Sequence, residues 1–175
     1  MNYQIMENNN INISKISYYI LFPDEQLEEE TPDVVSESEL GTHSSNQLSG
    51  DSNFLKLVKA TRRGLSYKSF YRAQKLMNFT QQDWAEIFHI SPRTIDRLKK
   101  DKKHLNSTLS EKLIEVTLLY DYGIEVFGSI EKFSTWLNRP SLYLGNVEPK
   151  SLLDTHQGIE AVKSELSRID YGILA

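Results

Sequence analysis

The stretch TQQDWAEIFHISPRTIDRLKK, residues 80–100, decides the fold because it reads as two capped helices joined by a tight turn. Thr80 can accept a hydrogen bond from the first turn of a helix, and Asp83 stands three residues later, in the capping-box position. Ser91 can cap a second helix, and Pro92 follows at the first helical position, where its missing N–H costs nothing. The spacing therefore predicts a helix-turn-helix.

The turn between these two helices falls at His89-Ile90. Ala85 is a small residue at a point where the two helices must approach each other closely. Glycine is common at the turn position of His89, because a positive φ is often needed there. Histidine is among the residues least penalised by that conformation, although it still has a cost. The histidine is thus the one departure of this segment from the usual pattern.

The second helix carries residue types that read DNA. The N-terminal residues of a recognition helix reach base edges in the major groove, where Arg93 can pair with guanine and Thr94 can touch a thymine methyl or a phosphate. Lysines after them, together with Lys68 and Arg72, would add sequence-independent attraction to phosphates. The alternative is an ordinary helical hairpin on a basic surface, or a motif retained for dimerisation. The candidate DNA-binding residues are Thr80, Gln81, Gln82, Ser91, Arg93, Thr94, Arg97, Lys99, Lys100 and Lys103.

Charge is segregated along the chain in a way that its net value of −4 conceals. Residues 1–53 hold one basic and ten acidic residues, residues 54–105 thirteen basic and four acidic, and residues 106–175 six basic and ten acidic. A basic middle between acidic ends is typical of a protein that binds a polyanion. A solvated basic face without a partner would give the same pattern.

Helical periodicity continues to the end of the chain, so we expect an all-α fold. A buried stripe predicts a long helix from about Leu109 to Phe127, and Gly128-Ser129 can end it and cap the next helix. Thr155 can cap a last helix. We therefore expect a helix-turn-helix domain over 54–127 and a C-terminal domain over 128–175. The last helix has its apolar stripe at Ile159, Val162, Leu166, Ile169 and Ile173.

The first 53 residues read as an acidic extension and linker, extended, weakly structured or disordered. Residues 1–22 are ambiguous, since the apolar run Tyr18–Phe22 fits a strand or a tail ordered by a partner. Residues 23–53 hold too little apolar surface to offset chain entropy. The opposite charges of this extension and the basic middle raise the hypothesis that it folds back and competes with DNA.

Several function classes are disfavoured. The chain has no cysteine, which suits a reducing cytoplasm and excludes disulfides and thiol catalysis. No signal peptide or membrane span is evident, so we expect a cytoplasmic protein. No phosphate-binding loop, dinucleotide fingerprint or nucleophile elbow is present. Since its histidines lack metal-ligand spacing, we expect no enzyme activity, metal or cofactor. The histidines are His43, His89, His104 and His156.

From about Ser66 to its end, the chain resembles the Xre/MbcA/ParS family of antitoxins, in which an Xre-like helix-turn-helix precedes a toxin-binding domain. Gly145-Asn146 stands where the family usually has two glycines, and Asn also tolerates the left-handed conformation. The resemblance is carried by SPRTI at 91–95, LSEKL at 109–113, VFG at 126–128, Trp136-Leu137, Pro140, Leu144-Gly145, Pro149, Leu152-Leu153, Thr155, Gly158, Val162, Leu166, Arg168-Ile169 and Gly172.

The resemblance implies an antitoxin that covers the active site of a cognate toxin, most often a RES-domain protein acting on NAD, and that often represses its own operon. Arg168 and Tyr171 would be interface anchors, whereas Trp136, Leu153, Val162 and Leu166 are expected in the core. The candidate toxin-binding residues are Leu144, Gly145, Leu152, Thr155, Gly158, Arg168, Ile169, Tyr171 and Gly172.

Three interpretations stay open. The chain could bind both toxin and operator DNA, or bind toxin with a helix-turn-helix that no longer reads DNA. It could also be a stand-alone transcriptional regulator whose C-terminal domain only dimerises. We expect a homodimer through the helix-turn-helix region, because operator half-sites usually mirror a protein two-fold, and a hetero-oligomer with the toxin.

Overall fold

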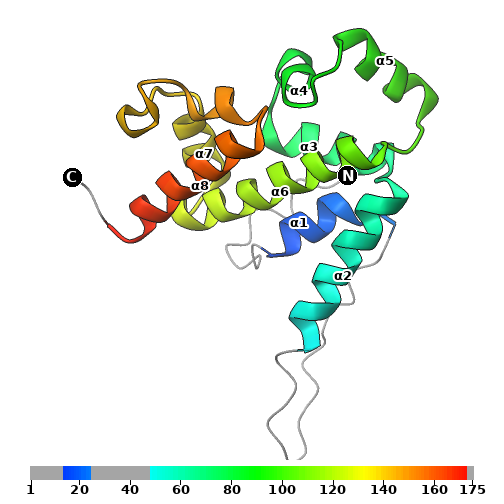
Figure 1. The fold of residues 1–175 in the computed structure, drawn as a ribbon, viewed down its shortest axis with the longest axis horizontal. Coiled ribbons are helices and arrows are strands. Elements are labelled where there is room, and N and C mark those ends of the chain that lie inside the picture. The colour runs from blue at the N-terminus through cyan, green and yellow to red at the C-terminus, as the bar shows by residue number, and fades with distance from the viewer. Residues whose placement is uncertain (1–13, 25–47, 173–175) are drawn as a thin grey trace, which may run out of the picture.

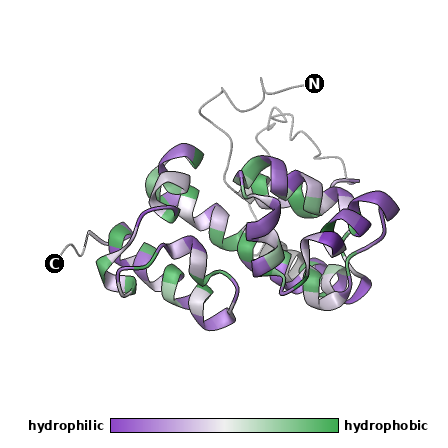
Figure 2. Cartoon of the chain, turned by 90° about the horizontal axis from the view of Figure 1, so that it is seen from above, coloured by the Kyte–Doolittle hydropathy of each residue, from purple (hydrophilic) through white to green (hydrophobic). Residues whose placement is uncertain are grey.

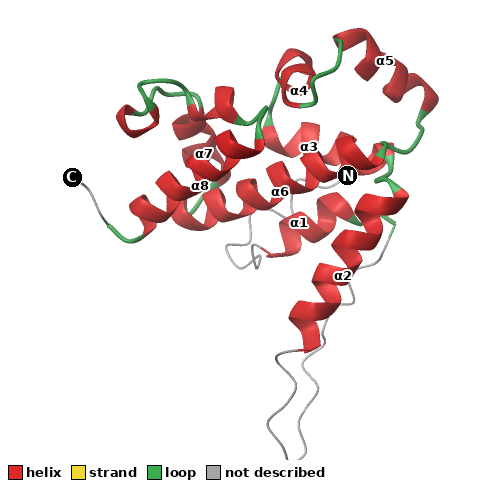
Figure 3. Cartoon of the chain, viewed as in Figure 1, coloured by secondary structure: helices red, strands yellow, loops and turns green. Residues whose placement is uncertain are grey.

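The computed structural model describes residues 14–24 and 48–172, and there every regular element is a helix, apart from an isolated bridge between Ser141 and Val147 (Figure 3). The predicted all-α fold is therefore confirmed. The α-helices are α1 (Ser14–Leu21), α2 (Leu48–Arg63), α3 (Tyr67–Met77), α4 (Gln81–Ile87), α5 (Pro92–Asp101), α6 (Ser107–Phe127), α7 (Ile130–Leu137) and α8 (His156–Asp170). Two short 3-10 helices, η2 (Leu142–Leu144) and η3 (Pro149–Leu152), lie between α7 and α8.

Helix α6 runs through the middle of the molecule, and α1, α2, α3, α7 and α8 pack against it (Figure 1). Helices α4 and α5 lie together at one end, and the η2 segment lies at the other. The helices carry hydrophobic residues on one side and hydrophilic residues on the other (Figure 2). Amphipathic helices gain most of their stability by packing their apolar faces together. Because helices from both ends of the chain pack against α6, α6 supports both halves of the molecule.

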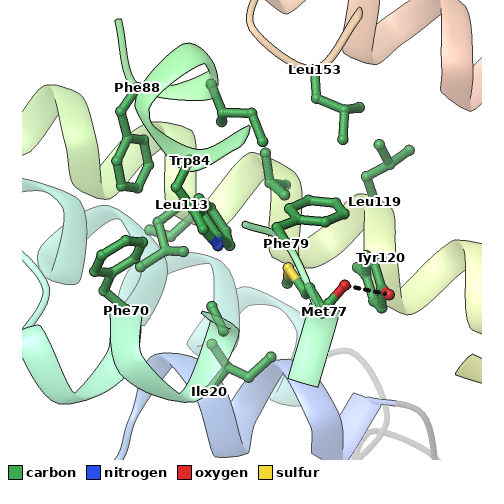
Figure 4. Close-up of a cluster of buried hydrophobic side chains, with 14 of the residues drawn as sticks. Ile20, Phe70, Met77, Phe79, Trp84, Phe88, Leu113, Leu119, Tyr120 and Leu153 are labelled. Carbon is green, nitrogen blue, oxygen red and sulfur yellow. Dashed lines mark hydrogen bonds between the residues drawn. The ribbon is translucent and has the colours of Figure 1, made fainter. Parts of the chain in front are cut away.

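The centre of the core is a cluster of aromatic side chains from several helices (Figure 4). Trp84 of α4 is fully buried between Phe70 and Phe88, with ring centroids 5.2 and 5.3 Å from its own. The buried Tyr120 hydroxyl of α6 donates a hydrogen bond to the carbonyl oxygen of Met77, 3.2 Å away. These contacts fix α3 and α4 on α6, which sets the position of α5 beyond them.

The N-terminal segment differs from our expectation, because Ser14–Leu21 form helix α1 rather than a strand or an extended tail. Ile20 and Leu21 are buried, and Ile16 is half-buried, so the spacing of four between Ile16 and Ile20 places both on one helical face. Ile20 and Leu21 of the apolar run are therefore part of the core, whereas Tyr19 is exposed. The rest of the expected extension, residues 1–13 and 25–47, lies outside the described residues.

The predicted helix boundaries hold closely after residue 60. Helix α6 begins at Ser107, two residues before the expected start, because Asn106 caps it by accepting a hydrogen bond from the Leu109 N–H. Helix α2 begins at Leu48, within the expected linker. The polar residues of its first turns lack the apolar periodicity on which the prediction relied. Ile173, the last member of the predicted stripe, lies outside the described residues.

The C-terminal core residues are confirmed: Leu153, Val162 and Leu166 are buried, and Trp136 is half-buried in a stack on Phe133, 5.9 Å between ring centroids. Among the described residues, no helix has both the length and the apolar character that crossing a bilayer requires.

Candidate functional site

The two helices of the helix-turn-helix are held by the predicted caps. The Thr80 hydroxyl accepts from the Asp83 N–H at 3.1 Å, and the Asp83 carboxylate accepts from the Thr80 N–H at 2.8 Å. The Ser91 hydroxyl accepts from the Thr94 N–H at 3.2 Å. Burial opposes ionisation of Asp83, but hydrogen bonds from Thr80 and Lys150 hold its pKa below the ordinary value. The Asp83 carboxylate of the folded protein is therefore charged at neutral pH.

His89 adopts the left-handed backbone conformation, with φ 51°, which is unfavourable for residues other than glycine. Its side chain gains a contact that glycine would lack, because Nε2 donates to the Asp154 carbonyl oxygen at 2.9 Å. A second link joins the same regions: the Lys150 ammonium lies 3.2 Å from the Asp83 carboxylate. The helix-turn-helix and the segment before α8 are thus tied at two points.

The outer face of α5 is basic and open to solvent. Ile95 and Leu98 turn toward the core, Ile95 being buried and Leu98 half-buried. The opposite face stands free at the edge of the molecule (Figure 1). Such a free, basic helix face is what entry into a major groove requires. The face carries the exposed cations Arg93, Arg97 and Lys100, which the sequence nominated. Lys99, also nominated, is exposed beside the buried face, four residues after Ile95.

Other nominated DNA-binding residues are engaged within the protein. Thr80 and Ser91 act as caps, and the amide of Gln82 donates to Glu86 at 2.8 Å. Thr94 is half-buried, with its hydroxyl 3.0 Å from that of Ser91. Lys103 lies 3.5 Å from the Asp101 carboxylate. Gln81 reaches across to α5, where its Nε2 donates to the Pro92 carbonyl oxygen.

Two of the three cations of α3, Lys68 and Arg72, contact the N-terminal segment. The Lys68 ammonium pairs with Asp24 at 2.8 Å, and this hydrogen bond is the main cause that holds the Asp24 pKa below its usual value. The Arg72 guanidinium donates to the carbonyl oxygens of Tyr19 and Pro23, and it stacks 4.0 Å from the centre of the Tyr19 ring. In this arrangement both cations have partners other than phosphate.

The loop between α7 and α8 is closed on itself. The Ser141 N–H donates to the Val147 carbonyl oxygen at 3.0 Å, and the Asn146 N–H donates to the Ser141 carbonyl oxygen at 2.8 Å. Asn146 has φ 63°, so asparagine takes the left-handed conformation as expected, after Gly145 at φ 79°. Two of the three η2 side chains, Leu142 and Tyr143, are exposed, whereas Leu144 is half-buried.

Large side chains remain exposed or half-buried where η2 packs against α8 and just beyond the end of α8. They are Leu142, Tyr143 and Val147 of the loop, Arg168 of α8, and Tyr171 directly after α8. Leu142 is 82% exposed and Tyr171 77% exposed, which is unusual for large apolar side chains. The Arg168 guanidinium lies 3.8 Å from the centre of the Tyr143 ring and 3.5 Å from the Glu165 carboxylate. We call these five residues the C-terminal patch.

The other nominated toxin-binding residues serve the shape of this region. Thr155 caps α8, and Gly158 lies so near the Leu152 carbonyl oxygen that a Cβ would stand 1.9 Å from it. Leu144, Leu152 and Ile169 are half-buried, and Gly172 ends the helix at φ 65°. Sequence reasoning named Arg168 and Tyr171 but missed Leu142, Tyr143 and Val147. The apolar run in LYLGNV, inside a predicted loop, was the available signal.

No group of three or more histidines or acidic residues suited to a metal ion occurs in the part of the chain that the structure describes.

Comparison with known proteins gives two family matches. Residues 56–116 match the antitoxin Xre-like helix-turn-helix domain, and residues 123–172 match the antitoxin Xre/MbcA/ParS C-terminal toxin-binding domain. The chain is also 28% identical over 113 residues to a protein of Photorhabdus laumondii named Antitoxin Xre. That similarity covers 64% of this chain and 76% of the relative. The matches span the basic helix-turn-helix face and the C-terminal patch.

Proposed function

Because the chain belongs to the Xre-type antitoxins, we propose that it binds and neutralises a cognate protein toxin through its C-terminal domain and binds operator DNA through α5. We further propose that the toxin is a RES-domain protein acting on NAD, and that the antitoxin covers its active site. This finer statement rests on the family resemblance alone.

The observation that carries toxin binding is the C-terminal patch. Large apolar side chains that remain exposed in a monomer mark sites of protein association. Tyrosine and arginine are enriched among the residues that dominate interface energy. Tyr143 and Arg168 are already stacked on each other, so little side-chain entropy is lost when a partner covers them.

Operator binding is supported by the free cations of α5. Arg93 and Arg97 lie four residues apart on its exposed face, one turn of helix from each other. Arginine pairs with guanine through two hydrogen bonds, and the neighbouring lysines add attraction to phosphates. A homodimer would offer two such helices to the two halves of an operator.

The toxin arm is tested by co-expression with the product of the neighbouring reading frame, with growth and cellular NAD as readouts. We expect the neighbour alone to arrest growth and deplete NAD, and this chain to restore both. If the neighbour arrests growth without depleting NAD, the RES-type assignment fails while neutralisation stands. If this chain rescues nothing, the toxin-binding proposal is wrong.

Variants of the patch sharpen that test. Tyr143→Ala removes an aromatic ring and the stack on Arg168, and it should weaken toxin binding by at least about tenfold. Tyr71→Ala, on α3, is a matched control because Tyr71 is 45% exposed and Tyr143 48% exposed. Equal neutralisation by both variants, with unchanged helicity, would move the toxin interface away from the patch.

A further inference from the structure

The DNA-facing surface of α5 contains one carboxylate among its cations. Arg93, Asp96, Arg97 and Lys100 follow at spacings of three, one and three, so they share a face opposite the buried Ile95. All four are exposed. Beside a polyanion, an unpaired carboxylate is unfavourable, so Asp96 calls for an explanation.

Asp96 is held in place by a side chain from the other helix of the motif. Nε2 of Gln81, the first residue of α4, donates to Oδ1 of Asp96 at 2.9 Å and to the Pro92 carbonyl oxygen at 2.9 Å. Both partners are acceptors, which fixes the orientation of the Gln81 amide with its NH2 group toward α5. The carboxylate is therefore braced about one turn into the recognition helix.

Asp96 does not serve to neutralise a cation of α5. Among the ion pairs of the described residues, Asp101 contacts Lys103, but none joins Asp96 to a cation of α5. An ionised carboxylate has lone-pair sites for about four hydrogen bonds, and Gln81 uses one of them. Asp96 thus retains acceptor capacity on the surface that would face DNA.

We infer that Asp96 is a specificity-determining residue, which accepts a hydrogen bond from the N4 amino group of a cytosine in the major groove. Cytosine N4 and adenine N6 are both donors on that edge, but adenine N6 lies beside the N7 acceptor, which repels a carboxylate, as do guanine N7, guanine O6 and thymine O4. The carboxylate also repels phosphates, so it weakens binding to DNA at large. Asp96 would therefore reduce non-specific affinity and select one base. This inference rests on the operator binding proposed above.

The test is a selection of binding sites from a randomised duplex library, carried out with the full chain and three variants. Asp96→Asn keeps an oxygen for the Gln81 amide but removes the charge, and Asp96→Ala removes both. Asp101→Asn makes the same charge change more than one turn further along α5, at a residue already paired with Lys103. Circular dichroism checks that each variant keeps the native helicity.

We expect the native chain and Asp101→Asn to select the same site, with cytosine at one position of each half. Asp96→Asn should lose that preference, by about tenfold in relative affinity, and favour adenine, which asparagine pairs with through two hydrogen bonds. Asp96→Ala should accept any base there and bind random DNA more tightly. If Asp96→Asn selects the native site unchanged, the inference is wrong while operator binding stands. If the native chain selects no site at all, operator binding fails and Asp96 has no base to read.

Discussion

Replacing Asp121 by asparagine should change how the stability of this protein depends on pH. Asp121 lies on α6 and accepts a hydrogen bond from the Ser17 hydroxyl of α1 through Oδ2. Its other oxygen, Oδ1, is buried without a hydrogen-bond partner among the described residues. Burial raises the pKa of Asp121 from 3.8 to about 6, the hydrogen bonds of Ser17 oppose the rise, and the nearby Glu125 adds to it.

The sign follows from which state holds the proton more tightly. The folded state binds it up to about pH 6, whereas the unfolded chain releases it near 3.8. Stability is therefore undiminished below the unfolded pKa and falls as pH rises through this window. A shift of about two units corresponds to about 3 kcal/mol. Because the residue is only half-buried, solvent screening reduces the expected loss to about 1–2 kcal/mol.

The assay is urea denaturation of the native chain and Asp121→Asn at several values between about pH 4 and about pH 8, followed by tryptophan fluorescence. Any fixed cost of the asparagine amide is the same at every pH, so the change in the difference between the two proteins isolates the carboxylate. The variant should gain about 1–2 kcal/mol relative to the native chain across that range. Asp170→Asn, an exposed residue of α8, is the control. A difference that stays constant with pH would refute the reasoning.

Two further substitutions test backbone positions near the sites. Gly158→Ala should destabilise the protein by about 2–4 kcal/mol in urea denaturation, because the added Cβ would clash with the Leu152 carbonyl oxygen. The control is Ser164→Ala on the exposed side of α8, which should leave stability unchanged. His89→Gly should change thermal stability little, since relief of about 1 kcal/mol of positive-φ strain offsets the lost bond to Asp154. His89→Ala keeps the strain without the bond, so a variant as stable as His89→Gly would contradict this account.

Features set by short local signals could be predicted from the sequence. The caps at Thr80, Ser91 and Thr155 each need one side chain and the backbone two or three residues later, and all three form as expected. The apolar stripe of α6 could be predicted because its members recur every three or four residues along a long helix. Five of them are buried in the structure: Leu109, Leu113, Val116, Tyr120 and Ile124. The positive φ of His89 followed from its place in the motif.

Features set by contacts between distant parts of the chain could not be predicted from the sequence. The apolar run of α1 fits a strand as well as a helix, and what decides it is packing on α6, including the Ser17–Asp121 bond between residues 104 positions apart. The occupation of Lys68 and Arg72 by the segment after α1 is also a long-range contact, so the sequence showed two cations and not their partners. The segment does lie against the basic middle, although the competition with DNA that we hypothesised stays a prediction.

The two proposed functions use surfaces at opposite ends of a shared core, α5 at one end and the η2 segment at the other (Figure 1). Because α6 supports both ends, a core substitution such as one at Leu113 would lower both activities together and assign neither. Surface variants separate them: Asp96 and Tyr143 are exposed, so each can be changed without opening the core. The bonds from His89 to Asp154 and from Lys150 to Asp83 cross between the two regions. Measuring operator affinity with and without bound toxin would therefore show how strongly the two binding events are coupled.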